Sequence, residues 1–292
     1  MFNKLGLLFM LIVCSGPAAL AAAPPHDRVY WDAIIQAQYA VPAGETPFAL
    51  AQELSEFLGS PDPELRDRIA YSILSVWLSG DTPFTNSELR ALLKEWQGNL
   101  KSDAVLKRSF SALSLAELVK RDRKSSFLEP AQYRELLTST LEYLASERDF
   151  RGFDPVRGWV HATAHTADLL AALARHRLLT PADQKQLLAG IALRLSSAGE
   201  VFTQGEQDRL AQAVTAIVLR SDFDAAGFDG WLTGLRATTR QAARTRPLTP
   251  AVLATVQNNT YFLQALYARL SLETIDGAAA KSRAAVLDAL NN

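Results

Sequence analysis

Apolar residues recur every three or four positions along most of the chain, and the strict alternation that marks a half-buried strand is nearly absent. Such a period places an apolar stripe along one side of each helix. The pattern predicts twelve helices, over residues 27–39, 47–58, 63–78, 86–99, 103–119, 130–147, 155–176, 181–195, 206–219, 223–244, 250–272 and 277–290.

Local start signals support several of these helices. Thr85-Asn86-Ser87-Glu88 has the form of a capping box, in which a hydroxyl and a carboxylate satisfy the first free N–H groups of a helix. Thr180-Pro181 and Thr249-Pro250 place a capping hydroxyl before a proline at the first helical position. These signals favour short turns between helices of modest length.

Helices joined by short turns predict an all-α fold of HEAT-like architecture, an α-solenoid of stacked antiparallel helix pairs. The segments 128–131, 179–182 and 248–251 resemble one another but recur at unequal intervals, so a regular repeat is not established. No stretch after residue 25 has the composition of a linker, and we expect residues 24–292 to form a single helical domain.

The first 23 residues have the pattern of a signal peptide. Lys4 precedes an apolar run over residues 5–13, and Ala18-Ala19-Leu20-Ala21 and Ala21-Ala22-Ala23 both offer cleavage sites. We expect cleavage after Ala21 or Ala23 and export to the periplasm. The run is too short to cross a bilayer, which takes about 20 apolar residues, and we expect no membrane span. Cleavage would remove Cys14, the single cysteine, and leave a mature chain without a disulfide.

The charge is nearly balanced, with 30 Lys and Arg against 31 Asp and Glu. No chain-wide attraction to nucleic acid follows, and we expect none to bind. A protein, a peptide or a small molecule remains as the partner.

The most informative segment is Gly158-Trp159-x-His161-x-x-x-His165-x-x-Asp168, which holds two of the four histidines. In a helix over residues 155–176, His161, His165 and Asp168 would share one narrow stripe. The rest of that helix is apolar, so these polar side chains need partners. The stripe is therefore either a site or a structural polar network.

A divalent metal is one possible occupant, because two histidines four residues apart on a helix can bind one ion, with Asp168 as a third ligand. Ala162 stands where a His-Glu-x-x-His protease carries its general base, which excludes that mechanism. Glu206, Asp149 or Glu147 could supply a fourth ligand.

A structural network is the other interpretation, in which arginines satisfy the carboxylates. The arginines are Arg151, Arg157 and Arg209, and the carboxylates are Asp168, Asp149 and Glu206. The candidate groove as a whole comprises Trp159, His161, His165, Asp168, Asp149, Arg151, Glu206 and Arg209.

Two other residue types receive simpler interpretations. Ser109 and Ser111 lie in a helical pattern without a glycine elbow, so we expect no serine nucleophile. The five tryptophans are scattered over the helices, which favours core anchors over a stacking platform.

Several segments together resemble a bacterial family known only as a domain of unknown function. They are 63–71, 108–116, 147–153, the histidine segment above, 205–211 and 258–267. The resemblance extends from about residue 48 to 272. It implies an all-helical, HEAT-like fold and carries no assigned activity.

The sequence thus leaves two functions open. One is a binding or scaffold protein, because stacked helix pairs present an extended face to a partner. The other is a metal-dependent or acid/base hydrolase that uses the same groove.

Overall fold

The computed structural model describes residues 26–291, which are almost entirely helical. The predicted signal peptide, residues 1–23, lies outside the described residues. The helices are α1 (Arg28–Gln36), α2 (Pro47–Phe57), η1 (Glu64–Tyr71), α3 (Ser72–Ser79), α4 (Asn86–Asn99), α5 (Val105–Lys124), α6 (Pro130–Ser146), α7 (Ala162–Ala174), α8 (Pro181–Ser197), α9 (Glu206–Val218), α10 (Ala225–Arg244), α11 (Pro250–Leu272) and α12 (Gly277–Asn291). The all-α prediction is confirmed.

The predicted start signals act as caps. Thr85 Oγ1 accepts from the N–H of Glu88 at 3.3 Å, while the Glu88 carboxylate accepts from the N–H of Thr85 at 2.7 Å. Thr180 and Asp183 form the same reciprocal pair at α8, and Thr249 caps α11. Each pair satisfies N–H groups that the first helical turn leaves free.

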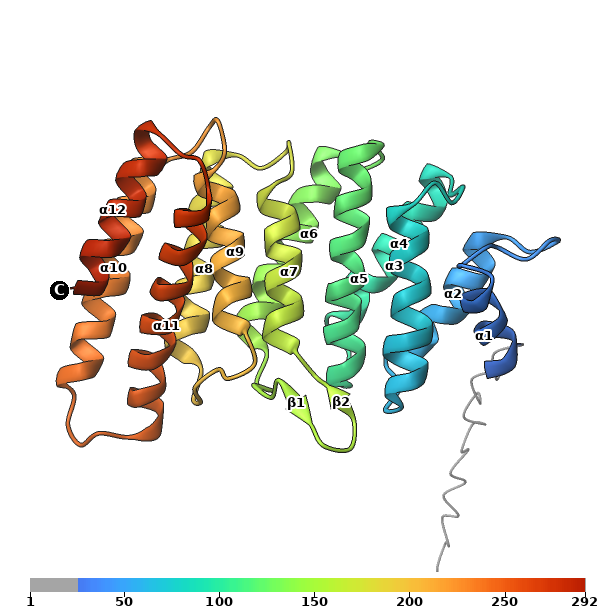
Figure 1. Cartoon of the computed structure of the whole chain (residues 1–292), viewed down its shortest axis with the longest axis horizontal. Helices are drawn as coiled ribbons and strands as arrows, with labels where there is room; N and C mark the ends of the chain where they lie inside the picture. Colours follow the sequence, from blue (N-terminus) through green and yellow to red (C-terminus); the bar gives the residue numbers. More distant parts are fainter. Residues whose placement is uncertain (1–25, 292) are drawn as a thin grey trace, which may run out of the picture.

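The helices form two rows (Figure 1). In the front row, α3, α5, α7, α9 and α11 pack one after another, and in the back row α8 packs against both α6 and α10. The contacts of α7 with α5 and α9 are the most extensive between any two elements of the described chain.

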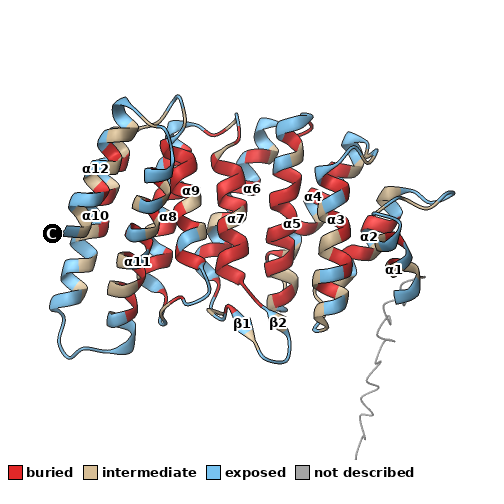
Figure 2. Cartoon of the chain, viewed as in Figure 1, coloured by how far each residue is buried: buried red, intermediate tan, exposed pale blue. Residues whose placement is uncertain are grey.

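Helix α7 lies at the centre of the front row and is buried almost all round (Figure 2). Of its residues, only Asp168 is not classed as buried. Alanines such as Ala164, Ala167 and Ala171 cover much of its surface, so α5 and α9 can approach closely. This packing on all sides explains why the sequence of α7 is apolar around almost its whole circumference.

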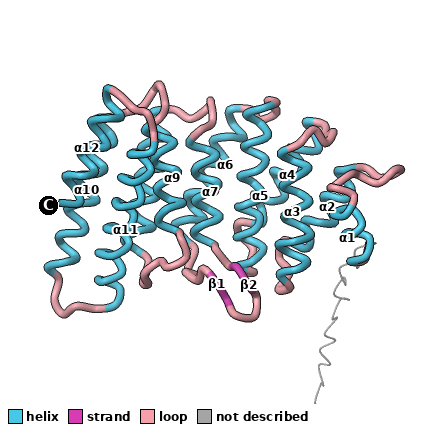
Figure 3. Tube along the Cα trace, viewed as in Figure 1, coloured by secondary structure: helices cyan, strands magenta, loops and turns pink. Residues whose placement is uncertain are grey.

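The predicted helix over residues 155–176 is wrong in its first turns. A hairpin of β1 (Phe153–Asp154) and β2 (Gly158–Trp159) occupies this segment, with Phe153 opposite Trp159 (Figure 3). The Asp154 carboxylate accepts from the N–H groups of Val156 and Arg157 at 2.9 and 3.0 Å. This side-chain-to-backbone turn competes with helix formation, and α7 begins only at Ala162.

The predicted helix over residues 63–78 is also divided. Its first part, η1, is a π-helix, in which each N–H bonds to the carbonyl five residues earlier, and α3 continues it. Arg66 in η1 is fully buried. Wide turns of this kind occur often at functional sites.

Three of the five tryptophans are buried as predicted, and Trp231 is partly buried against the core. Trp31, Trp77 and Trp96 are buried anchors of the core, whereas Trp159 in the hairpin is 43% exposed. No described helix is both long and apolar enough to cross a bilayer.

Candidate functional site

The structure splits the predicted stripe but keeps the two histidines together. His161 precedes α7 in a left-handed conformation, with φ 46° and ψ 32°, and His165 lies in the first turn of the helix. The N–H groups of Val160 and His161 both donate to the carbonyl of Gly152, at 2.9 and 3.2 Å. The two imidazole centroids lie 5.5 Å apart.

His165 is held by Ser109 of α5, a contact that the sequence did not indicate. The Ser109 hydroxyl donates to the carbonyl of Val160 at 2.5 Å and lies 2.8 Å from His165 Nδ1. Because that hydrogen is committed to Val160, Nδ1–H of His165 is the donor to Ser109. Burial lowers the pKa of His165 well below its usual value and keeps the ring neutral.

His161 lies between an aromatic ring and a carboxylate. The Trp159 indole stacks on it at 4.4 Å with an interplanar angle of 7°, and Phe153 meets the indole edge-on. His161 Nδ1 lies 3.8 Å from Glu206 Oε1. Burial would raise the pKa of Glu206, but His161 and the N–H of Gln204 lower it.

The carboxylates Asp168 and Asp149 belong to separate ion pairs. Asp168 Oδ2 lies 2.6 Å from Arg209 Nη1, while Asp149 pairs with Arg151. Burial raises the pKa of Asp168, against the effect of Arg209. Both pairs are among those that the sequence proposed, although Asp149 does not join the histidines.

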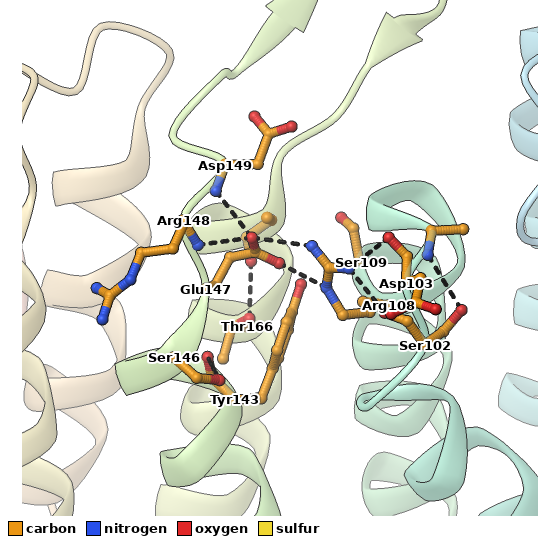
Figure 4. A network of polar contacts seen from close by, with 12 residues as sticks. Ser102, Asp103, Arg108, Ser109, Tyr143, Ser146, Glu147, Arg148, Asp149 and Thr166 are labelled. Atoms are coloured by element: carbon orange, nitrogen blue, oxygen red, sulfur yellow. Dashed lines mark hydrogen bonds and ion pairs between the residues drawn. The ribbon is translucent and has the colours of Figure 1, made fainter.

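A larger network lies behind α7, around Glu147 (Figure 4). Arg108 of α5 donates to both Glu147 oxygens, at 2.8 and 3.0 Å, and the N–H groups of Arg148 and Asp149 donate to Oε1. Although burial opposes it, these bonds lower the pKa of Glu147. Arg194 of α8 donates to the backbone carbonyl of Glu147 at 2.7 Å.

Arg66 connects η1 to the hairpin. Its guanidinium donates to the carbonyls of Arg157 and Trp159, at 2.8 and 3.3 Å, and lies 4.6 Å from the centre of the Phe110 ring. A single buried arginine thus satisfies the backbone of a distant loop. No local spacing signals this contact, because its partners are more than 90 residues away.

These contacts define what the histidine region can do chemically. Within residues 26–291, no three His, Cys, Asp or Glu side chains are grouped so that they could hold a metal ion. The Ser109–His165 pair resembles a nucleophile and a base, but Ser109 is fully buried and its hydroxyl is already bonded to Val160. Most polar groups of this region are paired with one another, but His161 Nδ1 has no hydrogen-bond partner among the described residues.

An open groove lies elsewhere, between α4 and α6. Its volume is about 800 Å³, and a second hollow of about 710 Å³ shares Lys101, Ser139 and Glu142 with it. Lys94 and Lys101 lie on the α4 wall, and Glu135 and Glu142 lie on the α6 wall. These four side chains form no hydrogen bond or ion pair within the described chain.

Comparison with known proteins places the chain in a family but gives no activity. No curated protein and no solved structure matches it. A family described as "Protein of unknown function (DUF2785)" matches residues 68–268, which include η1 from Arg68 onward, α7 and most of α11. The chain belongs to this family.

Proposed function

We propose that this protein is a binding scaffold of HEAT-like, α-solenoid architecture. The pairing of each helix mainly with its neighbours in two rows supports this architecture. In such a stack the interior fixes the geometry, and a partner binds on the outer faces of the helices.

In this proposal, the polar contacts around His161 and His165 stabilise the interior of the protein and do not bind a ligand. His165 bonds to Ser109, Asp168 to Arg209 and Glu147 to Arg108, so each contact joins two different parts of the stack. Buried polar groups that are fully paired fix the register of the elements that carry them. No observation favours the hydrolase alternative.

The groove between α4 and α6 is the observation that supports a binding function, and we propose it as the surface that binds the partner. The two helices run in the same direction, since Arg90 pairs with Glu129 at one end and Gln97 donates to Ser139 further along. These contacts place Lys94 of α4 near Glu135, and Lys101, in the turn directly after α4, near Glu142. The two lysines and the two glutamates are each seven positions apart in the sequence. The groove therefore has one basic and one acidic wall.

An amphipathic helix of a partner protein fits these walls. Seven residues span about 10.5 Å on a helix, so acidic side chains at i and i+7 would meet the basic wall, and basic ones on the other edge the acidic wall. Opposite charges brought together in a groove select the partner and its direction.

Site-specific photo-crosslinking in the native host tests the proposal. A photoreactive residue at Thr138, in the groove, should give an adduct that peptide mapping assigns to an amphipathic helix. The same residue at Leu193, exposed on α8, is the control and should give none. The double variant Lys94→Glu, Lys101→Glu should abolish the adduct, and an unchanged adduct would contradict the proposal.

We propose further that the scaffold acts after export. The support is the pattern of Lys4, the apolar run over residues 5–13 and Ala21-x-Ala23. Mass spectrometry of the protein from its native host should find a mature N-terminus near Ala22 or Pro24. An intact chain beginning at Met1 would contradict export.

A further inference from the structure

A separate, smaller hollow lies where α5, α7 and α9 end, away from the groove between α4 and α6. Its volume is about 280 Å³. Six residues line it: Arg123, Arg175, Ala216, Leu219, Arg220 and Ser221. Three of them carry guanidinium groups, and none carries a carboxylate.

The guanidinium group of Arg220 is occupied by contacts within the protein. Arg220 donates to the carbonyls of Ala174, His176 and Leu179, at 2.9 to 3.0 Å, and pairs with Asp222. It thereby satisfies free carbonyls at the end of α7. Its contacts explain its presence without a ligand.

The other two arginines have no such explanation. Arg175 makes a single hydrogen bond, to the carbonyl of Ala171 in its own helix at 3.1 Å. Arg123 makes no hydrogen bond or ion pair within the described residues. A guanidinium has five N–H donors, so most of the donors of this pair are free.

Arg220 and Arg269 are neutralised by Asp222 and Asp208, whereas Arg123 and Arg175 form no ion pair within the described residues. Burial lowers the pKa of Arg175, and the neighbouring guanidiniums of Arg123 and Arg269 lower it further, against the weaker effect of Glu273. Like charges held close together raise the energy of the empty site, and an anion between them would remove that repulsion.

We propose that Arg123 and Arg175 form a binding site for a small oxyanion with two negative charges, of which phosphate is the simplest example. A planar guanidinium presents paired N–H groups that match two oxygens of such an anion. The Ser221 hydroxyl in the lining adds one more donor. The volume suits a small ligand rather than a nucleotide or a peptide.

Helix ends modify this affinity. The C-terminal ends of α5 and α7 carry partial negative charge, which disfavours an anion nearby. Arg220 offsets this at α7 by binding its carbonyls. We therefore expect a dissociation constant in about the millimolar range, and not a nanomolar one.

Isothermal titration calorimetry tests the site with two probes, inorganic phosphate and succinate, at constant ionic strength adjusted with sodium chloride. Binding of phosphate alone identifies a tetrahedral oxyanion site, and binding of both identifies a general dianion site. Arg175→Gln and Arg123→Gln should each weaken binding at least tenfold. Arg134→Gln, at an exposed arginine of α6 outside the hollow, is the matched control and should bind as the wild type does.

Thermal unfolding provides a second measurement. Without phosphate, Arg175→Gln should unfold at the same or a higher temperature than the wild type, because it removes a repulsion and no ion pair. With phosphate near ten times its dissociation constant, the wild type alone should gain about 2 to 4 °C. The proposal is overturned if neither probe binds, or if both arginine variants bind as the wild type does.

Discussion

Ser109 and Ser114 lie five residues apart on α5, and both are fully buried. They differ in their partners: Ser109 bonds to Val160 and His165, while the Ser114 hydroxyl has no hydrogen-bond partner. Replacing each serine by alanine removes a buried hydroxyl, but only the change at Ser109 also breaks hydrogen bonds. The difference between the two changes in unfolding free energy therefore measures the contribution of those bonds.

Ser109→Ala should lower the free energy of unfolding by about 1 to 3 kcal/mol, because it leaves His165 Nδ1–H and the Val160 carbonyl unpaired. Ser114→Ala should be neutral or slightly stabilising, since it removes an unpaired group. Urea denaturation of both variants checks this, and equal losses would show that the network around His165 contributes nothing.

His165 should also make stability depend on pH. Its pKa is lowered in the folded state, so below the unfolded value of about 6.5 the unfolded chain takes up a proton that the native ring refuses. Stability is then present above pH 6.5 and is lost as the pH falls. Between pH 7 and pH 5 this residue should cost the wild type up to about 2 kcal/mol, the limit set by the unfolded pKa of about 6.5.

The variant His165→Asn lacks this titration, while its amide can still donate to Ser109. Its disadvantage relative to the wild type should therefore shrink from pH 7 to pH 5, by up to about 2 kcal/mol. Denaturant unfolding at both values measures the difference. A constant difference would mean that His165 is accessible to protons in the folded protein.

Sequence reasoning found the histidines but not what holds them. Two histidines in an apolar segment stand out, because buried polar groups require partners. The partners, Ser109 and Arg66, come from α5 and η1, and only tertiary packing brings them close. The pairing of Asp168 with Arg209 was easier to anticipate, since a carboxylate and an arginine are natural partners.

At the scale of elements, Gly152 fixes the hairpin against α9. Its carbonyl receives two N–H groups from Val160 and His161, and a Cβ at this position would meet the side chains of Gln204 and Glu206. The first contact involves Gln204 Cβ as well as Cγ, so rotation of a side chain does not relieve it. The close approach requires a glycine here.

Gly152→Ala should therefore destabilise the protein by about 1 to 3 kcal/mol through overpacking. Gly234→Ala, in the interior of α10, is the matched control, because its Cβ would enter open space. That change should stabilise by about 0.5 to 1 kcal/mol, the usual gain of alanine over glycine in a helix. Thermal and urea unfolding compare the two, and a loss at both positions would contradict this account.

Helices were predictable where both the period and the cap are local properties. Thr85, Thr180 and Thr249 marked three starts correctly, because a cap needs only the next few residues. The hairpin was missed because the apolar period of α7 was extended back through Pro155. Asp154-Pro155 between two glycines is a turn pattern that outweighs it.

At the scale of the whole molecule, burial falls from the centre of the stack toward its ends. Thirteen residues of α5 are buried, whereas α12 buries only Ser282 and Val286, and α1 only Trp31 and Ile34. Each element contacts mainly its neighbours, so the end helices lose support from one side.

Amide hydrogen exchange should follow this gradient. Protection should be highest in α5, α7 and α9 and lowest in α1 and α12, because a terminal helix opens without disturbing the centre. Exchange measured by mass spectrometry at peptide resolution checks the order. Uniform protection along the chain would mean that the stack unfolds as one unit.

The groove between α4 and α6 has a mechanical consequence. The five helices from α1 to α4 are attached to the rest mainly through α5, whose contacts with α3 and with α4 are each less extensive than its contact with α7. The front row packs continuously from α3 to α11, whereas the groove separates α4 from α6 on the other side. A structure with packing on one side only resists bending least at that point. We therefore expect bending of the protein to concentrate at the groove, so that the N-terminal quarter tilts while the hydrophobic interior around α7 keeps its shape.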